Sequence, residues 1–324
     1  MADVEIDICA IRRNAKKIAE RSRLIAVIKA DAYGHGMTRT AEALAGIADM
    51  FAVATEDEAR SLLENGIKDK DILILHPYPR PGISSGSVIY TLSDVSVVPA
   101  FKEMRTAVKL NTGMNRFGAD DGYARALLKE ASVNTKLHSV YSHLRCATDA
   151  DMSRMQIMRF EKITRGFENI PGHIASSGAL VRGNIPYGTA RCGIALYGGF
   201  GYERAMSVYA DVIETRLIGA GSGAGYGKSV LSRDKRVAVI DIGYAHGYRR
   251  SSVGGHVFLG GKPRKVLSVC MDCTITECGR DTRRGDRAEI MGEHIPPSEL
   301  ANKYRTVEYE VFTSFGGAGE KRYV

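Results

Sequence analysis

Lys29 stands at the end of an apolar run in residues 24–36, which read LIAVIKADAYGHG. The run predicts a buried strand, and small residues, a tyrosine, a histidine and two glycines follow the lysine at once. An amine at a strand end loses water, and this desolvation lowers its pKa. A neutral lysine amine is a nucleophile and a base, and it can form a Schiff base with a carbonyl compound. The alternative reading is a lysine whose charged end reaches the rim of the fold.

The elements that would position Lys29 alternate between short strands and helices. Eight β-rich runs occur at residues 24–29, 50–54, 71–75, 88–91, 107–110, 137–142, 172–175 and about 188–191. Helical patterns such as EDEARSLLENG and YARALLKEA lie between most of them, although prolines replace the expected helix in HPYPRPGISSGS. This alternation predicts a (β/α)8 TIM-type barrel over residues 10–200, with any chemistry at the strand ends.

The pattern changes after about Gly199. Short β-rich runs separated by glycine-rich turns follow, namely ADVIETRLIGAG, RVAVIDIGYAHG, GHVFLGG, KPRKVLSVCMD, RAEIMG and VEYEVFTSF. A helical pattern returns only near residues 296–304. We therefore expect a β domain over residues 201–324, on which residues 1–9 can pack. The expected fold class is α/β plus all-β.

Composition and charge exclude several classes of function. The chain has 324 residues, a formal net charge of +8 and a pI of about 9.1. The basic residues form no run of five or more, so an anionic small ligand explains the charge better than nucleic acid does. No basic leader and no apolar run of about 20 residues is present. We expect a cytoplasmic protein, with no membrane partner, whose six cysteines are reduced thiols.

The cysteines of CMDC raise the question of a metal site. The segment RKVLSVCMDCTITEC reads as one strand, in which Cys270 and Cys273 point to opposite faces. Cys270 and Cys278 would share a face but lie about 26 Å apart in an extended strand. We therefore expect no metal here.

VIKADAYGHG closely resembles the pyridoxal phosphate lysine motif of the alanine racemase family. Seven further segments, from KLNTGMNRFG to VCMDC, resemble motifs of that family in the same order along the chain. The others are YSHLRCATD, GHIASSGAL, ARCGIALYGG, AGYGKS and IGYAHGYRR. The resemblance begins near residue 4 and extends to about residue 272.

The resemblance implies pyridoxal phosphate as cofactor and assigns it a set of residues. In this assignment, Lys29 forms the Schiff base, and the phosphate is bound by Tyr33, Ser177, Gly193 and Ile194. Arg191 faces the ring nitrogen with His143 beside it, and Arg116 touches the cofactor. The resemblance further implies that Arg116, Tyr226, Met271 and Asp272 bind the substrate, and that Lys109 matches a lysine that is often carbamylated.

The implied reaction is the interconversion of L- and D-alanine, which supplies a D-amino acid for cell-wall peptidoglycan. Racemisation removes a proton from one face of Cα and returns one to the other, so two bases are needed. The resemblance assigns these roles to Lys29 and Tyr244. It also implies a head-to-tail homodimer with shared active sites, so that Tyr244 completes the site of the other chain.

Several positions depart from the family pattern. Asn111 and His246 stand where aspartate is usual, Cys192 replaces a proline, and Ser176 replaces a common asparagine. The C-terminal FTSFGGAGEKRYV places Phe315 near a tyrosine that touches the cofactor phosphate in relatives. A serine or broad-specificity racemase is therefore an alternative to an alanine racemase. A decarboxylase of the same cofactor class and a non-enzymatic pyridoxal phosphate-binding module are further alternatives.

Overall fold

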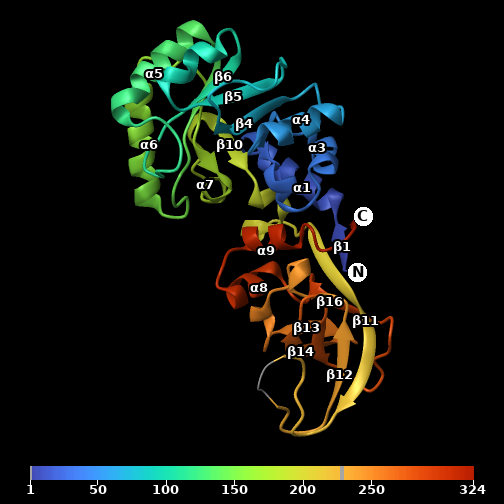
Figure 1. Ribbon diagram of the computed structural model, residues 1–324. Coiled ribbons are helices and arrows are strands. Elements are labelled where there is room, and N and C mark those ends of the chain that lie inside the picture. The colour runs from blue at the N-terminus through green and yellow to red at the C-terminus, as the bar shows by residue number, and fades with distance from the viewer. Residues whose placement is uncertain (1, 227–229) are drawn as a thin grey trace. The chain divides into compact units, whose positions relative to one another are not determined.

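The computed structural model describes residues 2–226 and 230–324, which divide into two compact units (Figure 1). The barrel unit contains residues 11–32 and 37–203. The β unit contains residues 2–10, 33–36 and 204–324. Tyr33 and the three residues after it thus belong to the β unit, although they follow directly on the Lys29 segment.

The barrel unit is built on one parallel sheet whose order is β8-β7-β6-β5-β4-β3-β2-β10-β9. β8 (Gly172–His173) pairs with β7, and β9 (Ala175–Ser176) pairs with β10. Because only Ile174 separates β8 from β9, the two ends of the sheet order belong to one segment and the sheet is a nearly closed barrel. The remaining strands are β2 (Arg23–Val27), β3 (Met50–Val53), β4 (Asp71–Pro77), β5 (Val88–Leu92), β6 (Arg105–Lys109), β7 (Lys136–Tyr141) and β10 (Thr189–Cys192).

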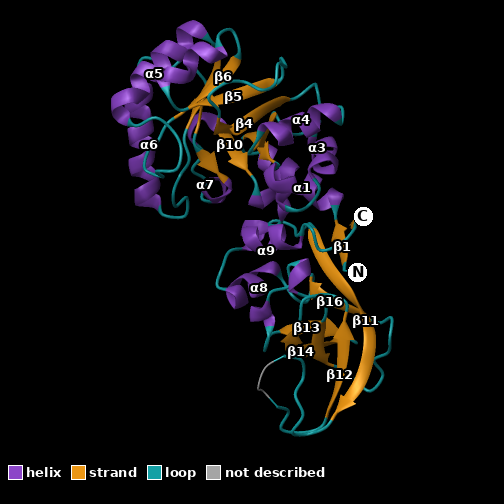
Figure 2. Ribbon diagram, viewed as in Figure 1, coloured by secondary structure: helices purple, strands orange, loops and turns teal. Residues whose placement is uncertain are grey.

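Helices surround these strands (Figure 2). They are α1 (Ile8–Ala19), α3 (Met37–Leu44), α4 (Glu56–Glu64), α5 (Asp121–Asn134), α6 (Ala150–Thr164) and α7 (Ser177–Val181), with the 3-10 helix η1 (Val95–Phe101). No helix lies between β4 and β5, where the prolines occur. Helix α4 shows how the sequence sets a boundary: the Thr55 hydroxyl accepts from Glu58 N, and the Glu58 carboxylate accepts from Thr55 N.

The β unit is a mostly antiparallel sheet with the order β12-β15-β14-β13-β16-β11-β1-β17. The strands are β1 (Asp3–Ile6), β11 (Met206–Ile218), β12 (Lys235–Ile240), β13 (His256–Leu259), β14 (Lys262–Val269), β15 (Thr274–Glu277), β16 (Arg287–Met291) and β17 (Lys321–Tyr323). The long β11 pairs with β1 and β16 along its first half and with β12 along its second half. The predicted fold class, a TIM-type barrel followed by a β domain, is confirmed.

Two predictions for the β unit were wrong. VEYEVFTSF is not a strand, because Glu308–Phe315 forms the helix α9, which follows α8 (Pro297–Tyr304). Val311, Phe312 and Phe315 are buried, and their spacing places them on one helical face. Acidic residues in the first turn also favour a helix N-terminus.

The segment RKVLSVCMDCTITEC is not one strand either. It is a hairpin in which β14 and β15 are antiparallel, and Cys270 N donates to Cys273 O at 2.8 Å across the turn. The turn carries no glycine or proline, which is why the sequence reading missed it. In the part of the chain that the structure describes, no three His, Cys, Asp or Glu side chains group as metal ligands, and no helix is long and apolar enough to cross a membrane.

Candidate active site

Lys29 opens a turn of unusual backbone conformation. β2 ends at Val27, two residues earlier than expected, and Ala30, Asp31, Ala32 and Tyr33 all have φ between 52° and 56°. This left-handed conformation costs L-residues about 1–2 kcal/mol each. Two hydrogen bonds hold the turn: Ala32 N donates to Ile28 O at 2.8 Å, and Met37 N donates to an Asp31 carboxylate oxygen at 2.7 Å. Such strain is typical of functional segments.

The Lys29 amine is half-buried and has a lowered pKa. Desolvation is the main cause, and the charges of Arg116 and Arg191 lower the pKa further, whereas Glu58 opposes them. Glu58 also supports the turn, because its Oε1 accepts from Ala30 N at 2.6 Å. The amine therefore loses its proton more easily than a lysine in water, as a nucleophile or base requires.

Arg191, on β10, is almost completely buried and is held by His173 of β8 and by the two residues that directly follow β7. Its Nη1 donates to His173 Nδ1 at 2.8 Å, and its Nη2 donates to His143 Nδ1 at 2.9 Å and to Ser142 O at 2.7 Å. A guanidinium has only donors, so both histidines must accept through Nδ1 and carry their hydrogen on Nε2. Burial and the Arg191 charge hold the pKa of both histidines well below the ordinary value.

His173 is a residue that the sequence reading missed. Its ring stacks on Tyr141 with centroids 5.0 Å apart, and its Nε2 lies 3.3 Å from Ser139 Oγ. Tyr141 also contacts the Arg191 guanidinium, 5.0 Å from the ring centroid. The sequence did contain a signal for this role. His173 is the second residue of GHIASSGAL and lies in a barrel strand, where an inward histidine can reach a neighbouring strand.

Lys109 is buried at the end of β6, with Nζ 5.0 Å from the Tyr141 ring centroid. Desolvation, together with the charges of Arg191, Arg116 and Lys29, lowers its pKa to about 7. Four cationic side chains thus influence one another at the strand ends, with Arg191 permanently charged. A cluster of this kind attracts an anion such as a phosphate, a carboxylate or a carbamate.

Ser177, Gly193 and Ile194 lie near one another in the barrel unit. Ser177 begins α7 directly after β9, and its Oγ accepts from Ala195 N at 3.4 Å. Gly193 and Ile194 lead from β10 into the 3-10 helix Ile194–Tyr197. Cys192, which occupies the place of the usual proline, is buried, and burial raises the pKa of its thiol to about 12. Cys192 is thus a neutral packing residue at neutral pH.

The other predicted site residues belong to the β unit. Tyr244 opens the 3-10 helix Tyr244–His246 and is 43% exposed. Its backbone N donates to Cys270 O at 3.0 Å, and Ala245 N donates to Met271 O at 2.8 Å. The CMDC turn therefore holds the backbone that carries Tyr244, and it presents Met271 and Asp272 beside it. Tyr226 is exposed and lies next to residues 227–229, which fall outside the described residues.

The aromatic ring beside Tyr33 belongs to a residue that the motifs did not indicate. The Phe315 ring is completely buried, and the ring of Tyr309, in α9, lies 5.9 Å from that of Tyr33. Tyr309 therefore presents a partly exposed phenol beside Tyr33. The sequence reading missed it because VEYEVFTSF was taken as a strand, in which Tyr309 had no defined neighbour.

Comparison with known proteins agrees with this arrangement. Residues 6–200 match the family model for the alanine racemase N-terminal domain, and residues 205–323 match that for the alanine racemase C-terminal domain. The chain belongs to the alanine racemase family. The resemblance found in the motifs is thereby confirmed. The individual roles of the site residues remain predictions.

Relatives within the alanine racemase family cover almost the whole chain. The alanine racemase of Rhizobium meliloti is 32% identical over 98% of this chain and 96% of its own length. That of Deinococcus radiodurans is 32% identical over 99% and 98%. The crystal structure of alanine racemase from Bartonella henselae with covalently bound pyridoxal phosphate has a TM-score of 0.91 at 27% identity, covering 100% of this chain and 99% of that one. The Bacillus anthracis enzyme with bound L-Ala-P has a TM-score of 0.90 at 26% identity, covering 99% and 94%.

Gly243→Ala tests whether the CMDC turn holds Tyr244 in place. A Cβ at Gly243 would lie 2.4 Å from Met271 O and 2.5 Å from Cys270 O, so one of the two backbones must move. We expect a loss of racemase activity of tenfold or more, measured by chiral chromatography of alanine, because Tyr244 follows directly. Gly317→Ala is the control, since a Cβ there meets nothing within 4 Å. Equal activity of the two variants would contradict the role of the turn.

Lys109→Met tests the burial of the amine. The folded protein releases the Lys109 proton near pH 7, whereas the unfolded chain does so near the ordinary value of 10.5. Between these values the unfolded state binds more protons, so stability rises with pH. In buffer free of carbon dioxide, we expect the methionine variant to have the higher melting temperature at pH 7, and this advantage to shrink by pH 10. The exposed Lys129→Met variant should show no such trend, and an identical trend in both would refute the assignment.

Proposed function

We propose that this protein is a pyridoxal phosphate-dependent alanine racemase that interconverts L- and D-alanine. The observation that carries the proposal is the desolvated Lys29 amine at the end of a barrel strand, influenced by Arg116 and Arg191, in a chain that matches alanine racemases along its length. Alanine is the expected substrate because the curated relatives carry that name. Serine or broader specificity is the alternative, because the C-terminal segment departs from the family pattern.

The donor set fits pyridoxal phosphate. Lys29 provides the amine for its aldehyde, and the Ser177 hydroxyl, the amides of Gly193 and Ile194 and the Tyr33 hydroxyl provide donors for its phosphate. The Tyr309 ring packs beside that of Tyr33, 5.9 Å between centroids. When bound, the cofactor withdraws electrons from the substrate Cα and so acidifies the Cα proton.

Arg191 is assigned to the ring nitrogen, with His143 beside it. Burial lowers the pKa of Arg191 to about 10, so the guanidinium stays charged at neutral pH and donates hydrogen bonds without giving up its proton. Facing the ring nitrogen, this guanidinium would keep that nitrogen unprotonated and would so limit how far negative charge spreads from Cα. The residues thus favour prompt return of the proton over side reactions such as transamination.

Two side chains move the Cα proton in this proposal. The Lys29 amine serves the face of the D enantiomer, and the Tyr244 phenol serves that of the L enantiomer. Arg116 and the Met271 amide bind the substrate carboxylate, and Tyr226 and Asp272 line the substrate. Lys109, largely neutral above pH 7, can take up carbon dioxide, and the resulting carbamate would offset the charge of Arg116 and Arg191.

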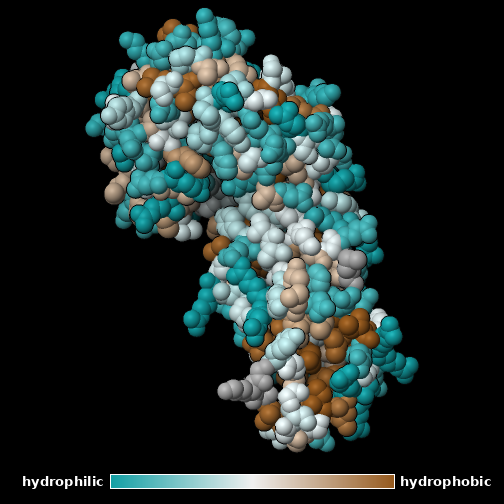
Figure 3. All heavy atoms as spheres, in the orientation of Figure 1, coloured by the Kyte–Doolittle hydropathy of each residue, from teal (hydrophilic) through white to brown (hydrophobic). Residues whose placement is uncertain are grey.

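We further propose a head-to-tail homodimer in which Tyr244 of one chain serves Lys29 of the other. Exposed apolar side chains of β11, Ile213 and Leu217, support an association surface on the β unit, where apolar surface gathers in Figure 3. The setting we propose is the cytoplasm, where the product D-alanine would serve peptidoglycan synthesis. The six free cysteines suit a reducing compartment.

The primary test is racemisation itself. Protein loaded with pyridoxal phosphate should convert L-alanine to D-alanine, and Lys29→Ala should abolish both racemisation and the covalent retention of cofactor after borohydride reduction. The exposed Lys16→Ala is the matched control and should behave as the parent does. Faster turnover of serine than of alanine would move the assignment to the alternative, and cofactor retention without turnover of any amino acid would favour a binding module.

Complementation tests the position of Tyr244. Lys29→Ala and Tyr244→Ala chains should each be inactive, but mixed chains should regain activity, because each hybrid dimer contains one site with both bases. Subunit exchange is verified by native mass spectrometry of tagged chains. If exchange occurs without recovery of activity, Tyr244 either acts within its own chain or is not the second base.

A further inference from the structure

Arg116 is carried by a loop that is closed at its base. Ala119 N donates to Lys109 O at 2.9 Å, and Asn111 N donates to Ala119 O at 2.9 Å, so the chain returns to the end of β6 after the loop. Gly118 permits this return, because a Cβ there would lie 2.7 Å from Asn111 N, and its φ is 114°. The Arg116 side chain is exposed, so the shape of the loop rather than burial must define its position.

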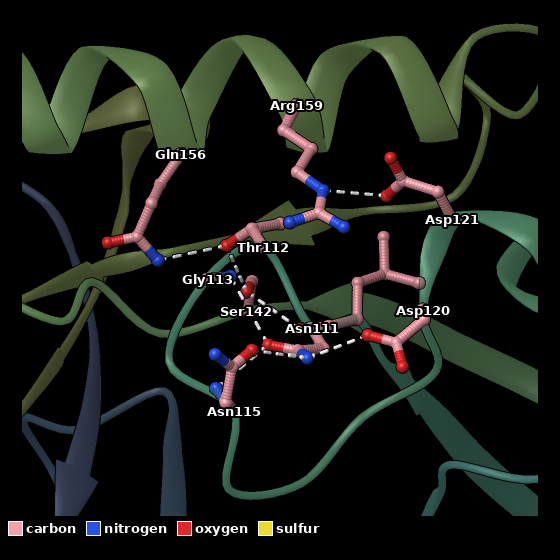
Figure 4. A network of polar contacts seen from close by, with 10 residues as sticks. Asn111, Thr112, Gly113, Asn115, Asp120, Asp121, Ser142, Gln156 and Arg159 are labelled. Atoms are coloured by element: carbon pink, nitrogen blue, oxygen red, sulfur yellow. Dashed lines mark hydrogen bonds and ion pairs between the residues drawn. The ribbon is translucent and has the colours of Figure 1, made fainter.

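The Asn111 side chain lies inside this loop and makes all four hydrogen bonds available to an amide (Figure 4). Its Oδ1 accepts from Gly113 N at 3.2 Å and from Asn115 N at 3.0 Å. Its Nδ2 donates to Asn115 Oδ1 at 2.9 Å and to Asp120 Oδ1 at 2.7 Å. Asn111 thus binds both the backbone and the side chain of the residue that precedes Arg116.

The partners of Asn111 show why this contact shapes the loop. Asn115 has a φ of 55°, a left-handed conformation that asparagine tolerates better than most residues, and Asn111 holds it there. Asp120 precedes α5 but makes no capping hydrogen bond, so its carboxylate is available to accept from Asn111. Asp121 next to it is paired with Arg159 Nε at 2.7 Å.

A second set of contacts fixes the base of the loop to the barrel. The Thr112 hydroxyl lies 2.7 Å from Ser142 Oγ and accepts from Gln156 Nε2 of α6 at 3.1 Å. Ser142 Oγ donates to Leu110 O, and Ser142 O accepts from Arg191. The base of the loop is thus held by the same strand end that holds Arg191. At its tip, the Phe117 ring lies 5.5 Å from the His76 ring, and Asn111 supplies the hydrogen bonds to Asn115.

We propose that Asn111 is a positioning residue for Arg116, and that this chain requires its neutral amide, although aspartate is usual here in the family, because the amide faces the Asp120 carboxylate. The inference rests on the proposed function, in which Arg116 binds the substrate carboxylate. An aspartate at this position would keep the two backbone contacts. It would lose both donations and would place a second carboxylate against Asp120.

The test exchanges the amide and the carboxylate. N111D should lower kcat/KM for alanine about tenfold, mainly through KM, because a misplaced arginine weakens carboxylate binding before and during reaction. D120N keeps an acceptor for Asn111 and should stay near the parent. N111D/D120N restores a donor–acceptor pair, with the Asn115 amide turned to donate, and should recover most of the loss. This reciprocal rescue would show that the side chains at positions 111 and 120 act as a pair.

A double-mutant cycle separates positioning from a general effect on the fold. If Asn111 acts through Arg116, N111D should have little further effect in the R116A background, whereas equal losses in both backgrounds would overturn the proposal. An unchanged KM in N111D would also overturn it. If N111D does not fold, N115G makes the same comparison, because it keeps the positive φ and removes the amide that Asn111 binds.

A readout independent of turnover distinguishes this proposal from the proposed function. Arg116 lowers the pKa of Lys29, so the pH dependence of Lys29 acylation, followed by peptide mass spectrometry, reports where Arg116 lies. N115G, which changes no charge, should move this titration to higher pH, as R116A does, and N111D should do so as well, in part through its own added charge. A parent protein without racemase activity would refute the proposed function. Lys29 acylation that is unchanged in N111D would refute the role of Asn111.

Discussion

The barrel site depends on the hydrogen bonds and the positive charge of Arg191, whose buried guanidinium contacts no carboxylate among the described residues. Arg191 is surrounded by a carbonyl, two imidazoles and a tyrosine ring, none of which brings negative charge at neutral pH. No carboxylate of the described residues pairs with it, and its charge acts on the titratable groups nearby. The lowered pKa values of Lys29, Lys109 and both histidines share this cause, with desolvation as the larger part. An anionic ligand is the natural complement of such a site.

Much of the fold was accessible from the sequence because the local signals agreed with one another. The barrel strands are apolar runs separated by helices, of which α4, α5 and α6 have acidic residues in the first turn. The segment 77–87 lacks a helix because prolines prevent one. The failures have physical causes. Residues 307–315 resemble a strand in sequence because charged and hydrophobic side chains alternate from Glu308 to Val311. The helical face becomes evident only from the burial of Phe312 next to Val311. The turn at residues 270–273 carried no glycine, so the hairpin was hidden.

The site was predictable as a set of residue types but not as a set of contacts. Lys29 and Arg191 were found through motifs, yet nothing in those motifs indicated that His173 holds the second nitrogen of the guanidinium. Asn111 was noticed only as a departure from a pattern. Its importance depends on Asp120 and Asn115, nine and four residues further on, which meet it only because the loop returns to its own base. The closure of an irregular loop produces no periodic pattern of residue types from which it could be predicted.

The left-handed turn after Lys29 also bears on the order in which the molecule folds. Four consecutive L-residues with positive φ cost about 4–8 kcal/mol in an isolated chain, so the turn is almost unpopulated before tertiary contacts form. Besides the local bond from Ala32 N to Ile28 O, two helices support it: Glu58 of α4 binds Ala30, and the α3 amide of Met37 binds Asp31. Those helices must be in place before the turn becomes stable. The lysine segment is therefore a late-forming element, and partly folded chains do not yet hold the amine in its final geometry.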